Sequence, residues 1–483
     1  MIGLDAADLG LIRSWSSTLP NLRRVLASGP VHTLRSPADL LTGSVWPTFY
    51  TATTPGEHGI YHHLQWDAAS MRLRRVGSDW LDCEPFWSEL DRRGRRVIAI
   101  DVPLLFPGHG RRGRGVEVLN WGSHDTLGPF ACNPRSLKGE IRRRFGPHPM
   151  GCEIPVGKSA EELTQIRDAL VRGARRKGAL VRWLLDREPF DFFIAVFGET
   201  HRGGHILWPD GPGTDAIPVD ALLDVYRAVD EALGEILAAP ALADAGSIVF
   251  SLHGMGPNTS QEHFVPRVMD LVNEGFSERG PERPGNRERR GVAPPAIVRR
   301  LRERVPPSIQ NRVAHLVPVS VRDAVVNRSI VAGHEWSDTA GFDLLSDLNG
   351  YLRLNVRGRE RDGIVERNGE TFDRYVAWVR ECFASLTIAV SGERLVEDVH
   401  LARERFPGRR VDHLPDLVVT WSGNPPASRV ESGRIGTVTA ERATGRSGNH
   451  RRDGFCVVSV PGKELPAPSD VRDLAPLVAA ALE

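Results

Sequence analysis

The hydrophobic and polar positions along the chain alternate between short apolar runs and stretches with helical spacing. Helical spacing is found at residues 85–94, 160–185, 219–237 and 370–385. Apolar runs typical of buried strands begin the segments 1–5, 95–103, 190–208, 246–256, 350–365, 416–421 and 455–462. Strands that alternate with helices in this way predict an α/β fold with a mostly parallel central sheet and helices on both faces.

Two stretches rich in Gly, Pro and Arg interrupt this alternation. The first, residues 104–160, predicts loops over one face of the sheet. The second, residues 276–328, has too little apolar content to build a core, and we expect an insertion or cap segment there. Its basic run is typical of a solvated surface rather than a nucleic-acid site. Residues 1–275 and 329–483 are expected to form one domain together.

Carboxylate and imidazole side chains lie next to several of the expected strands. Asp5 ends the first apolar run, His201 and His205 follow a later one, and His253 follows the next. His450 comes shortly before the last strand. Open α/β sheets place their binding sites at the carboxyl ends of strands. Since imidazole and carboxylate groups are ligands for divalent metals, these positions predict a metal site.

The spacing of three of the histidines bears on this prediction. His201 and His205 are four residues apart, so a helical segment would point both imidazoles the same way. Together with His450 they could hold zinc and leave one position open for a substrate. A single histidine is more often a hydrogen-bonded core or surface residue. Three of them near expected strand ends favour metal binding.

The segment TGSVWPTFYTATTPGEHGIY, from Thr42 to Tyr61, predicts a loop, a short helix and a second loop. Thr42 would stand at the helix start, where unpaired backbone N–H groups and the helix dipole can hold an anion. A hydroxyl in that position is either an N-cap or a nucleophile beside a bound phosphate. The pattern of this segment alone leaves both roles open.

Composition and charge narrow the class of protein. The 483 residues are 41% hydrophobic and 25% charged, which suffices for one large core or two unequal ones. The 62 basic and 61 acidic residues give a formal net charge of +1. The overall charge therefore provides no long-range attraction to nucleic acid or to an anionic membrane. Any anionic substrate must therefore be held locally; the partner we expect is a small molecule rather than a nucleic acid.

Cysteine usage and the absence of long apolar runs bear on the compartment. The five cysteines are scattered and lack CxxC spacing, which indicates neither a disulfide framework nor a thiolate zinc site. No apolar run approaches the ~20 residues of a membrane span, and the N-terminus lacks the basic and apolar regions of a signal peptide. We expect a reducing compartment and a cytoplasmic location.

Motifs spread over nearly the whole chain point to one family. The chain opens with IGLDA, and later stretches read SLHGM around His253, GNHRRDG around His450, LNVRGRERDGIV and PDLVV. A gap-free pattern is formed by Thr42, Trp46, Thr51, Pro55, His58, Gly59 and Ile60. In these motifs the chain resembles the type I phosphodiesterase and nucleotide pyrophosphatase family of the alkaline phosphatase superfamily.

The resemblance implies a three-layer alkaline-phosphatase-like catalytic domain with a threonine nucleophile, which falls on Thr42. A register that matches the family's W-P pair to Trp46 and Pro47 would put Val45 there and requires a gap, so we reject it. The resemblance also implies one or two divalent cations, with zinc expected first and Mn or Mg as alternatives. The expected ligands of one are His201, His205 and His450; those of the other are Asp5, Thr42, His253 and the residue at position 252.

Two metal-binding positions depart from the family pattern. His201 stands where the family has Asp, a mild change because zinc accepts imidazole as well as carboxylate. Leu252 stands where the family has a second Asp, and an aliphatic side chain cannot bind a cation. The nearest replacement carboxylate by sequence is Glu199, two residues before His201.

The function implied by the resemblance is metal-dependent hydrolysis of phosphate esters, at phosphodiester or nucleotide pyrophosphate bonds, through a threonyl-phosphate intermediate. One alternative is a catalytically impaired member that binds metal or nucleotide. Another is a phosphomonoesterase or phosphotransferase. A sulfatase is disfavoured, because no C-x-P-x-R or S-x-P-x-R segment could supply its formylglycine. The sequence does not determine the leaving group.

Overall fold

The computed structural model describes residues 1–106, 115–124, 127–151, 158–209, 214–276, 319–331, 333–441 and 445–483. The chain divides into two compact units, each with its own hydrophobic core. The first comprises Met1–Thr54, Gly77–Asn258 and Gly445–Glu483, and the second comprises Pro55–Val76 and Thr259–Thr444. The expected division into one catalytic domain and an insertion at 276–328 stays a prediction, because residues 277–318 lie outside the described part of the chain.

An eight-stranded sheet runs through the first unit in the order β2-β19-β9-β1-β8-β5-β6-β7. Its interior strands, from β9 to β6, pair in parallel, and antiparallel pairs join β19 and β2 at one edge and β7 at the other. This confirms the predicted, mostly parallel central sheet. The strands are β1 (Ile2–Leu4), β2 (Val31–Leu34), β5 (Val97–Ile100), β6 (Val116–Leu119), β7 (Ala131–Asn133), β8 (Phe192–Phe197), β9 (Ser247–Ser251) and β19 (Gly454–Ser459).

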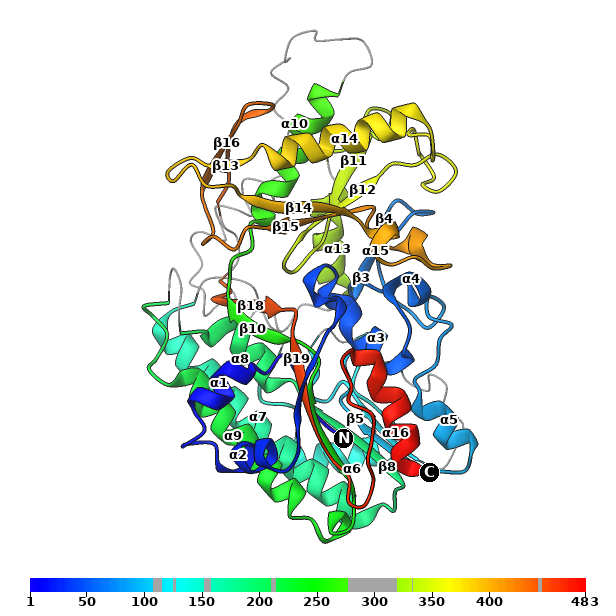
Figure 1. The fold of residues 1–483 in the computed structure, drawn as a ribbon, viewed down its shortest axis with the longest axis vertical. Coiled ribbons are helices and arrows are strands. Elements are labelled where there is room, and N and C mark those ends of the chain that lie inside the picture. Colours follow the sequence, from blue (N-terminus) through cyan, green and yellow to red (C-terminus); the bar gives the residue numbers. More distant parts are fainter. Residues whose placement is uncertain are drawn as a thin grey trace. The chain divides into compact units, whose positions relative to one another are not determined.

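Helices cover both faces of this sheet (Figure 1). Strand β8 shows why, because its successive side chains point to opposite faces and all are buried. Phe193 packs in the core that includes the long helices α7 and α9, whereas the ring of Phe192 contacts Phe86 and Trp87 at the start of α5. The helices of this unit are α1 (Leu9–Ser14), α2 (Pro20–Ala27), α3 (Val45–Thr51), α5 (Trp87–Arg92), α6 (Ser136–Phe145), α7 (Ala160–Arg187), α8 (Glu199–Leu207), α9 (Ala221–Leu237) and α16 (Leu474–Leu482).

The prediction of loops throughout residues 104–160 was wrong. This stretch contains β6, an interior strand of the sheet, as well as β7 and α6. Strand β6 has only four residues, all of them buried, and helix α6 buries only Leu137 and Ile141 beneath an Arg-rich surface. Patterns this short are hidden when composition is averaged over a Gly- and Arg-rich stretch, and pairing with β5 stabilises what the local sequence only weakly favours.

The second unit is built on an antiparallel sheet of order β11-β12-β15-β14, with α10 and α14 in the same core. It contains the strands expected near 350–365 and 416–421 and the helix expected at 370–385. The elements are α4 (Pro55–His58), β3 (Leu64–Asp67), β4 (Arg72–Arg75), α10 (Val265–Gly275), α13 (Val319–Val331), β11 (Gly341–Leu344), β12 (Gly350–Leu354), α14 (Glu370–Ala384), β13 (Thr387–Ile388), β14 (Val396–Leu401), α15 (Ala402–Arg405), β15 (Leu417–Trp421), β16 (Arg429–Ser432) and β17 (Gly436–Thr439).

Arg359 and Glu360 of the motif LNVRGRERDGIV form ion pairs inside the second unit. The buried Arg353 donates to Glu360 Oε1 at 2.7 Å, and Arg359 donates to both carboxylate oxygens of Asp416 at 2.7 and 2.6 Å. Buried charges are tolerated when they are paired and hydrogen-bonded in this way. The motif therefore has a structural role in this chain.

Two further expectations concern thiols and membranes. The described cysteines, Cys83, Cys132, Cys382 and Cys456, are all free thiols, and Cys152 lies outside the described residues. Among the residues that the structure describes, no helix combines the length and the apolar content that crossing a bilayer would need.

The core around α9 allows a direct test of the fold. Leu233 of α9 is fully buried, so we expect Leu233→Ala to lower the free energy of unfolding by about 2–5 kcal/mol, through lost transfer energy and the cavity it leaves. Glu235→Ala on the exposed face of the same helix is the control and should change stability by less than about 0.5 kcal/mol. Urea unfolding followed by circular dichroism measures both, and equal midpoints would contradict the packing.

Candidate metal centre

Helix α8 places two of the predicted histidines. Strand β8 ends at Phe197, and after Gly198 the chain turns directly into α8. His201 and His205 lie one turn apart on this buried helix, as their spacing predicted, with their Nε2 atoms 3.0 Å apart. The carboxyl end of a central strand thus delivers both imidazoles.

A short antiparallel ribbon brings in His253 and His450. His253 lies between β9 and β10 (Gly254–Pro257), and His450 lies in β18 (Gly448–Arg451), which pairs with β10. The ring centroid of His450 lies 4.6 Å from that of His205 and 4.6 Å from that of His253. The ribbon approaches α8 closely, since a Cβ atom on Gly448 would lie 2.1 Å from the carbonyl oxygen of Gly204. Only glycine at this position permits the approach.

Asp5 lies at the carboxyl end of β1, between β8 and β9 in the sheet. Its Oδ1 atom accepts a hydrogen bond from Trp46 Nε1 at 2.9 Å and lies 3.7 Å from His253 Nε2. Its Oδ2 atom lies 3.0 Å from His201 Nδ1. The structure thus brings together five residues singled out in the sequence: Asp5, His201, His205, His253 and His450.

A sixth residue, His124, was missed by the sequence analysis. Its Nδ1 atom lies 3.2 Å from Asp5 Oδ2, and its ring stacks on that of His201 with centroids 3.7 Å apart. His124 follows β6 in the segment NWGSH, within the stretch taken for loops. The available signal was the short apolar run VEVL followed by polar residues and an imidazole, the same pattern that identified His253.

Burial and neighbouring charges shift the pKa values of four of these groups. Burial and the nearby His124 lower the pKa of His201 to about 4, although Asp5 acts in the opposite direction. Burial likewise lowers the pKa values of His253 and His450. Burial alone would raise the pKa of Asp5, but its imidazole neighbours outweigh this effect and hold it below the ordinary value. These directions favour an ionised Asp5 beside neutral His201, His253 and His450, the forms in which carboxylate and imidazole bind metal.

The arrangement of these donors fits a divalent cation. Two groups have ligand atoms that all lie within 4.8 Å of one another: His201, His253 and His450, and Asp5, His124 and His201. The buried atoms Asp5 Oδ2, His201 Nδ1 and His450 Nδ1 have no hydrogen-bond partner among the described residues. Two donors on one tetrahedral cation, each at ~2.1 Å, would be about 3.4 Å apart. The separations of 3.0 and 3.2 Å around Asp5 Oδ2 are close to that value.

Thr42 begins a 3₁₀ turn, Thr42–Ser44, that continues into α3. Its Oγ1 atom donates to the carbonyl oxygen of Ala38 at 3.4 Å. Trp46, the residue that donates to Asp5, follows four residues later. Two neighbouring hydroxyls, those of Ser44 and Thr48, are also buried.

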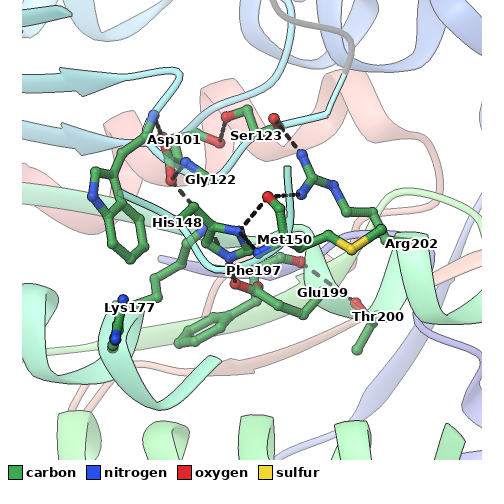
Figure 2. Close-up of polar contacts among 12 residues, drawn as sticks. Asp101, Gly122, Ser123, His148, Met150, Lys177, Phe197, Glu199, Thr200 and Arg202 are labelled. Atoms are coloured by element: carbon green, nitrogen blue, oxygen red, sulfur yellow. Dashed lines mark hydrogen bonds and ion pairs between the residues drawn. The ribbon is translucent and has the colours of Figure 1, made fainter. Parts of the chain in front are cut away.

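Glu199, the candidate replacement ligand, makes other contacts (Figure 2). Its Oε1 atom accepts from His148 Nε2 at 2.9 Å and lies 3.9 Å from Lys177 Nζ. Burial alone would raise the pKa of Glu199, but Lys177 and His148 lower it to about 2. The two groups of candidate ligands in the described part of the chain do not include Glu199.

Comparisons with known proteins agree with this architecture. The family model for type I phosphodiesterase / nucleotide pyrophosphatase matches residues 1–424. Phosphonoacetate hydrolase from Sinorhizobium meliloti 1021 superposes with a TM-score of 0.56, at 14% identity over 99% of this chain and 94% of that one. Murine ectonucleotide pyrophosphatase / phosphodiesterase 5 superposes with a TM-score of 0.53, at 12% identity over 100% of this chain and 94% of that one.

At these identities the structural likeness shows the fold, which is the predicted alkaline-phosphatase-like one. A search of curated proteins gave no match. The family model covers most of the chain and includes every candidate ligand except His450. The chain therefore belongs to the type I phosphodiesterase / nucleotide pyrophosphatase family and is a phosphoester hydrolase of that type.

Proposed function

We propose that the chain hydrolyses phosphodiester or pyrophosphate bonds of small phosphate compounds, with Thr42 as nucleophile and divalent cations held by the centre around Asp5. The observation that carries this proposal is the hydrogen bond from Trp46 Nε1 to Asp5 Oδ1 at 2.9 Å. It fixes α3 to the carboxylate, and Thr42 begins the 3₁₀ turn that continues directly into α3. The proposal therefore places the Thr42 hydroxyl beside the imidazoles.

The residues have separate tasks in this reaction. Thr42 Oγ1 attacks phosphorus, which forms an Oγ1–P bond and breaks the bond to the leaving oxygen. The hydroxyl proton, directed at the carbonyl oxygen of Ala38 in the free protein, passes to solvent or to the leaving oxygen. Water then cleaves the threonyl-phosphate and releases phosphate or a phosphate monoester. Trp46 holds Asp5 Oδ1, so that Oδ2 is left for the centre.

The centre supplies what these side chains lack. A bound divalent cation favours the alkoxide form of a nearby hydroxyl and neutralises charge on the phosphoryl oxygens. The residues that would hold it are Asp5, His201, His205, His253 and His450. Imidazole-rich donor sets suit zinc better than Mg²⁺ or Mn²⁺, which prefer oxygen ligands, so we propose zinc.

The proposed substrate class takes support from the relatives. A structure of the phosphonoacetate hydrolase contains phosphonoacetate, and an inactive threonine-to-alanine variant of the murine enzyme contains AMP. Both ligands are small and carry a phosphorus oxyanion. With a formal net charge of +1, this chain has little long-range attraction for such anions, so the buried centre must provide the binding energy.

One observation favours a second candidate, a binder of metal or nucleotide without turnover. Leu252 is fully buried and has no donor atom. With one ligand fewer, the cation beside the nucleophile would bind more weakly. Two equivalents of metal would favour the enzyme, and one or none would favour the binder. A screen of aryl phosphomonoesters, aryl phosphodiesters, nucleotides and aryl sulfates with added Zn²⁺, Mn²⁺ or Mg²⁺ tests turnover directly.

Replacing the nucleophile is the sharpest test of the mechanism. We expect Thr42→Ala to reduce kcat at least about a thousand-fold, because the remaining centre can only orient the phosphoryl group and a water. The variant should fold and keep its metal content. Thr42→Ser should retain part of the activity, since the hydroxyl survives. Steady-state kinetics with the best substrate of the screen measures both variants.

Two neighbouring hydroxyls provide matched controls for this test. Ser44→Ala and Thr48→Ala remove buried hydroxyls from the same segment, and both should keep most of the activity. If Thr42→Ala turns over substrate at the wild-type rate while Ser44→Ala or Thr48→Ala does not, the nucleophile is the neighbour.

Metal removal tests the other half of the proposal. Dialysis against a chelator should abolish turnover and lower the melting temperature, because a ligand that binds only the folded state stabilises it. Removing the imidazole of His450 should weaken Zn²⁺ binding by more than about 100-fold. Calorimetric titration with Zn²⁺ measures the affinity, with His32→Ala, outside the centre, as control. A chelated protein with unchanged melting temperature and turnover would refute the metal requirement.

A further inference from the structure

We infer that His124 is a ligand of the cation on the Asp5 side of the centre, where it supplies the donor that position 252 lacks. The cation would be held by Asp5, His124 and His201. This inference rests on the proposed function, in that it takes the centre to bind divalent cations. The family resemblance assigned no role to His124.

The contacts of Asp5 carry the inference. Nδ1 atoms of two different histidines approach the same oxygen, His201 at 3.0 Å and His124 at 3.2 Å. Neither Asp5 Oδ2 nor His201 Nδ1 makes a hydrogen bond within the described residues, although both are buried. A buried carboxylate oxygen and ring nitrogen without hydrogen bonds are costly unless something else satisfies them. A cation bound between these donors would satisfy them together.

The two nitrogens of His201 separate two sets of donors. Nδ1 faces Asp5 and His124, whereas Nε2 faces His205 Nε2 at 3.0 Å. If Nδ1 binds the Asp5 cation, His205, His253 and His450 are left for another, and the ring centroid of His450 lies 4.6 Å from that of each of the other two. Three protein ligands with an open position are typical of a catalytic zinc site.

Hydrogen bonds around Asp101 hold the residues that precede His124 (Figure 2). The carboxylate of Asp101 accepts hydrogen bonds from the backbone N–H groups of Trp121 and Gly122, each at 2.8 Å. Ser123 Oγ donates to the carbonyl oxygen of Asp101 at 3.0 Å. These bonds fix the three residues that precede His124.

Further contacts tie this loop to its surroundings. Arg202 Nη2 donates to the carbonyl oxygen of Ser123 at 2.8 Å, which joins the loop to the residue after His201 on α8. Lys177 Nζ lies 3.0 Å from Asp101 Oδ2, and both side chains are fully buried. A surrounding shell of hydrogen bonds that orients metal ligands is a general feature of metal sites. The network of Asp101, Arg202 and Lys177 surrounds the proposed ligands in this way, because it binds the residues next to His124 and His201.

The experiment counts metal ions rather than turnover. Wild-type protein and His124→Ala are loaded with Zn²⁺, freed of excess metal and analysed for bound metal by mass spectrometry, with affinities from calorimetric titration. We expect His124→Ala to lose one equivalent, or to bind it at least about 100-fold more weakly. His400→Ala, which removes a histidine of the second unit, is the matched control and should bind as wild type does.

A rescue variant separates ligation from a general structural effect. Adding Leu252→Asp to His124→Ala restores a carboxylate where the family has one and should return the lost equivalent. His124→Gln keeps a polar side chain of similar length without the ring nitrogen, and it should show the same loss as His124→Ala. Circular dichroism confirms that each variant is folded.

The outcomes distinguish this inference from the proposed function. If wild type binds Zn²⁺ and both His124→Ala and His124→Gln bind the same number of ions with unchanged affinity, His124 is not a ligand and the proposed function stands. If the double variant stays one ion short, His124 does not substitute for position 252. A wild-type protein that binds no divalent cation would refute the proposed function, and the role of His124 with it.

Discussion

The first unit depends on one buried carboxylate. Asp5 ends the strand between β8 and β9 and is almost completely inaccessible to solvent, so its charge must be compensated locally. An indole N–H fixes one oxygen, and imidazoles from a helix and a loop surround the other. Elements from distant parts of the sequence thus meet at one carboxylate, and their packing is the scaffold on which any chemistry must occur.

Close backbone packing sets the second constraint. The β10–β18 ribbon lies against α8 at a distance that only glycine at position 448 allows, and Ser447 N donates to His205 O at 2.8 Å. This contact determines how near His450 comes to His205, because both backbones are held rather than the side chains alone. His201, His205 and His450 are therefore held by a helix and a strand, which position side chains more precisely than mobile loops do.

Within one fold, a metal ligand that is missing at one position can be replaced by a donor from another position that lies close enough to the same site. With leucine at position 252, a cation bound beside Asp5 would have one ligand fewer than the family resemblance implies. Instead, the loop after β6 is fixed by Asp101 and Arg202 and presents an imidazole 3.2 Å from the same oxygen. Lys177, which lies between Asp101 and Glu199, connects this loop to the buried network around Glu199.

The sequence by itself determined the fold class, most of the long elements and the positions of Asp5 and four histidines, because these depend on local periodicity and on motifs that lie at strand ends. It did not reveal β6, α6 or His124, since their patterns are short and masked by neighbouring Gly and Arg. Nor did it separate the unit that contains β11, β12, β14 and β15. Only the tertiary structure decided which donors meet, turning Glu199 toward Lys177 and His124 toward Asp5. Distances between residues far apart in sequence follow from how sheet, helix and ribbon pack, and no local pattern records that packing.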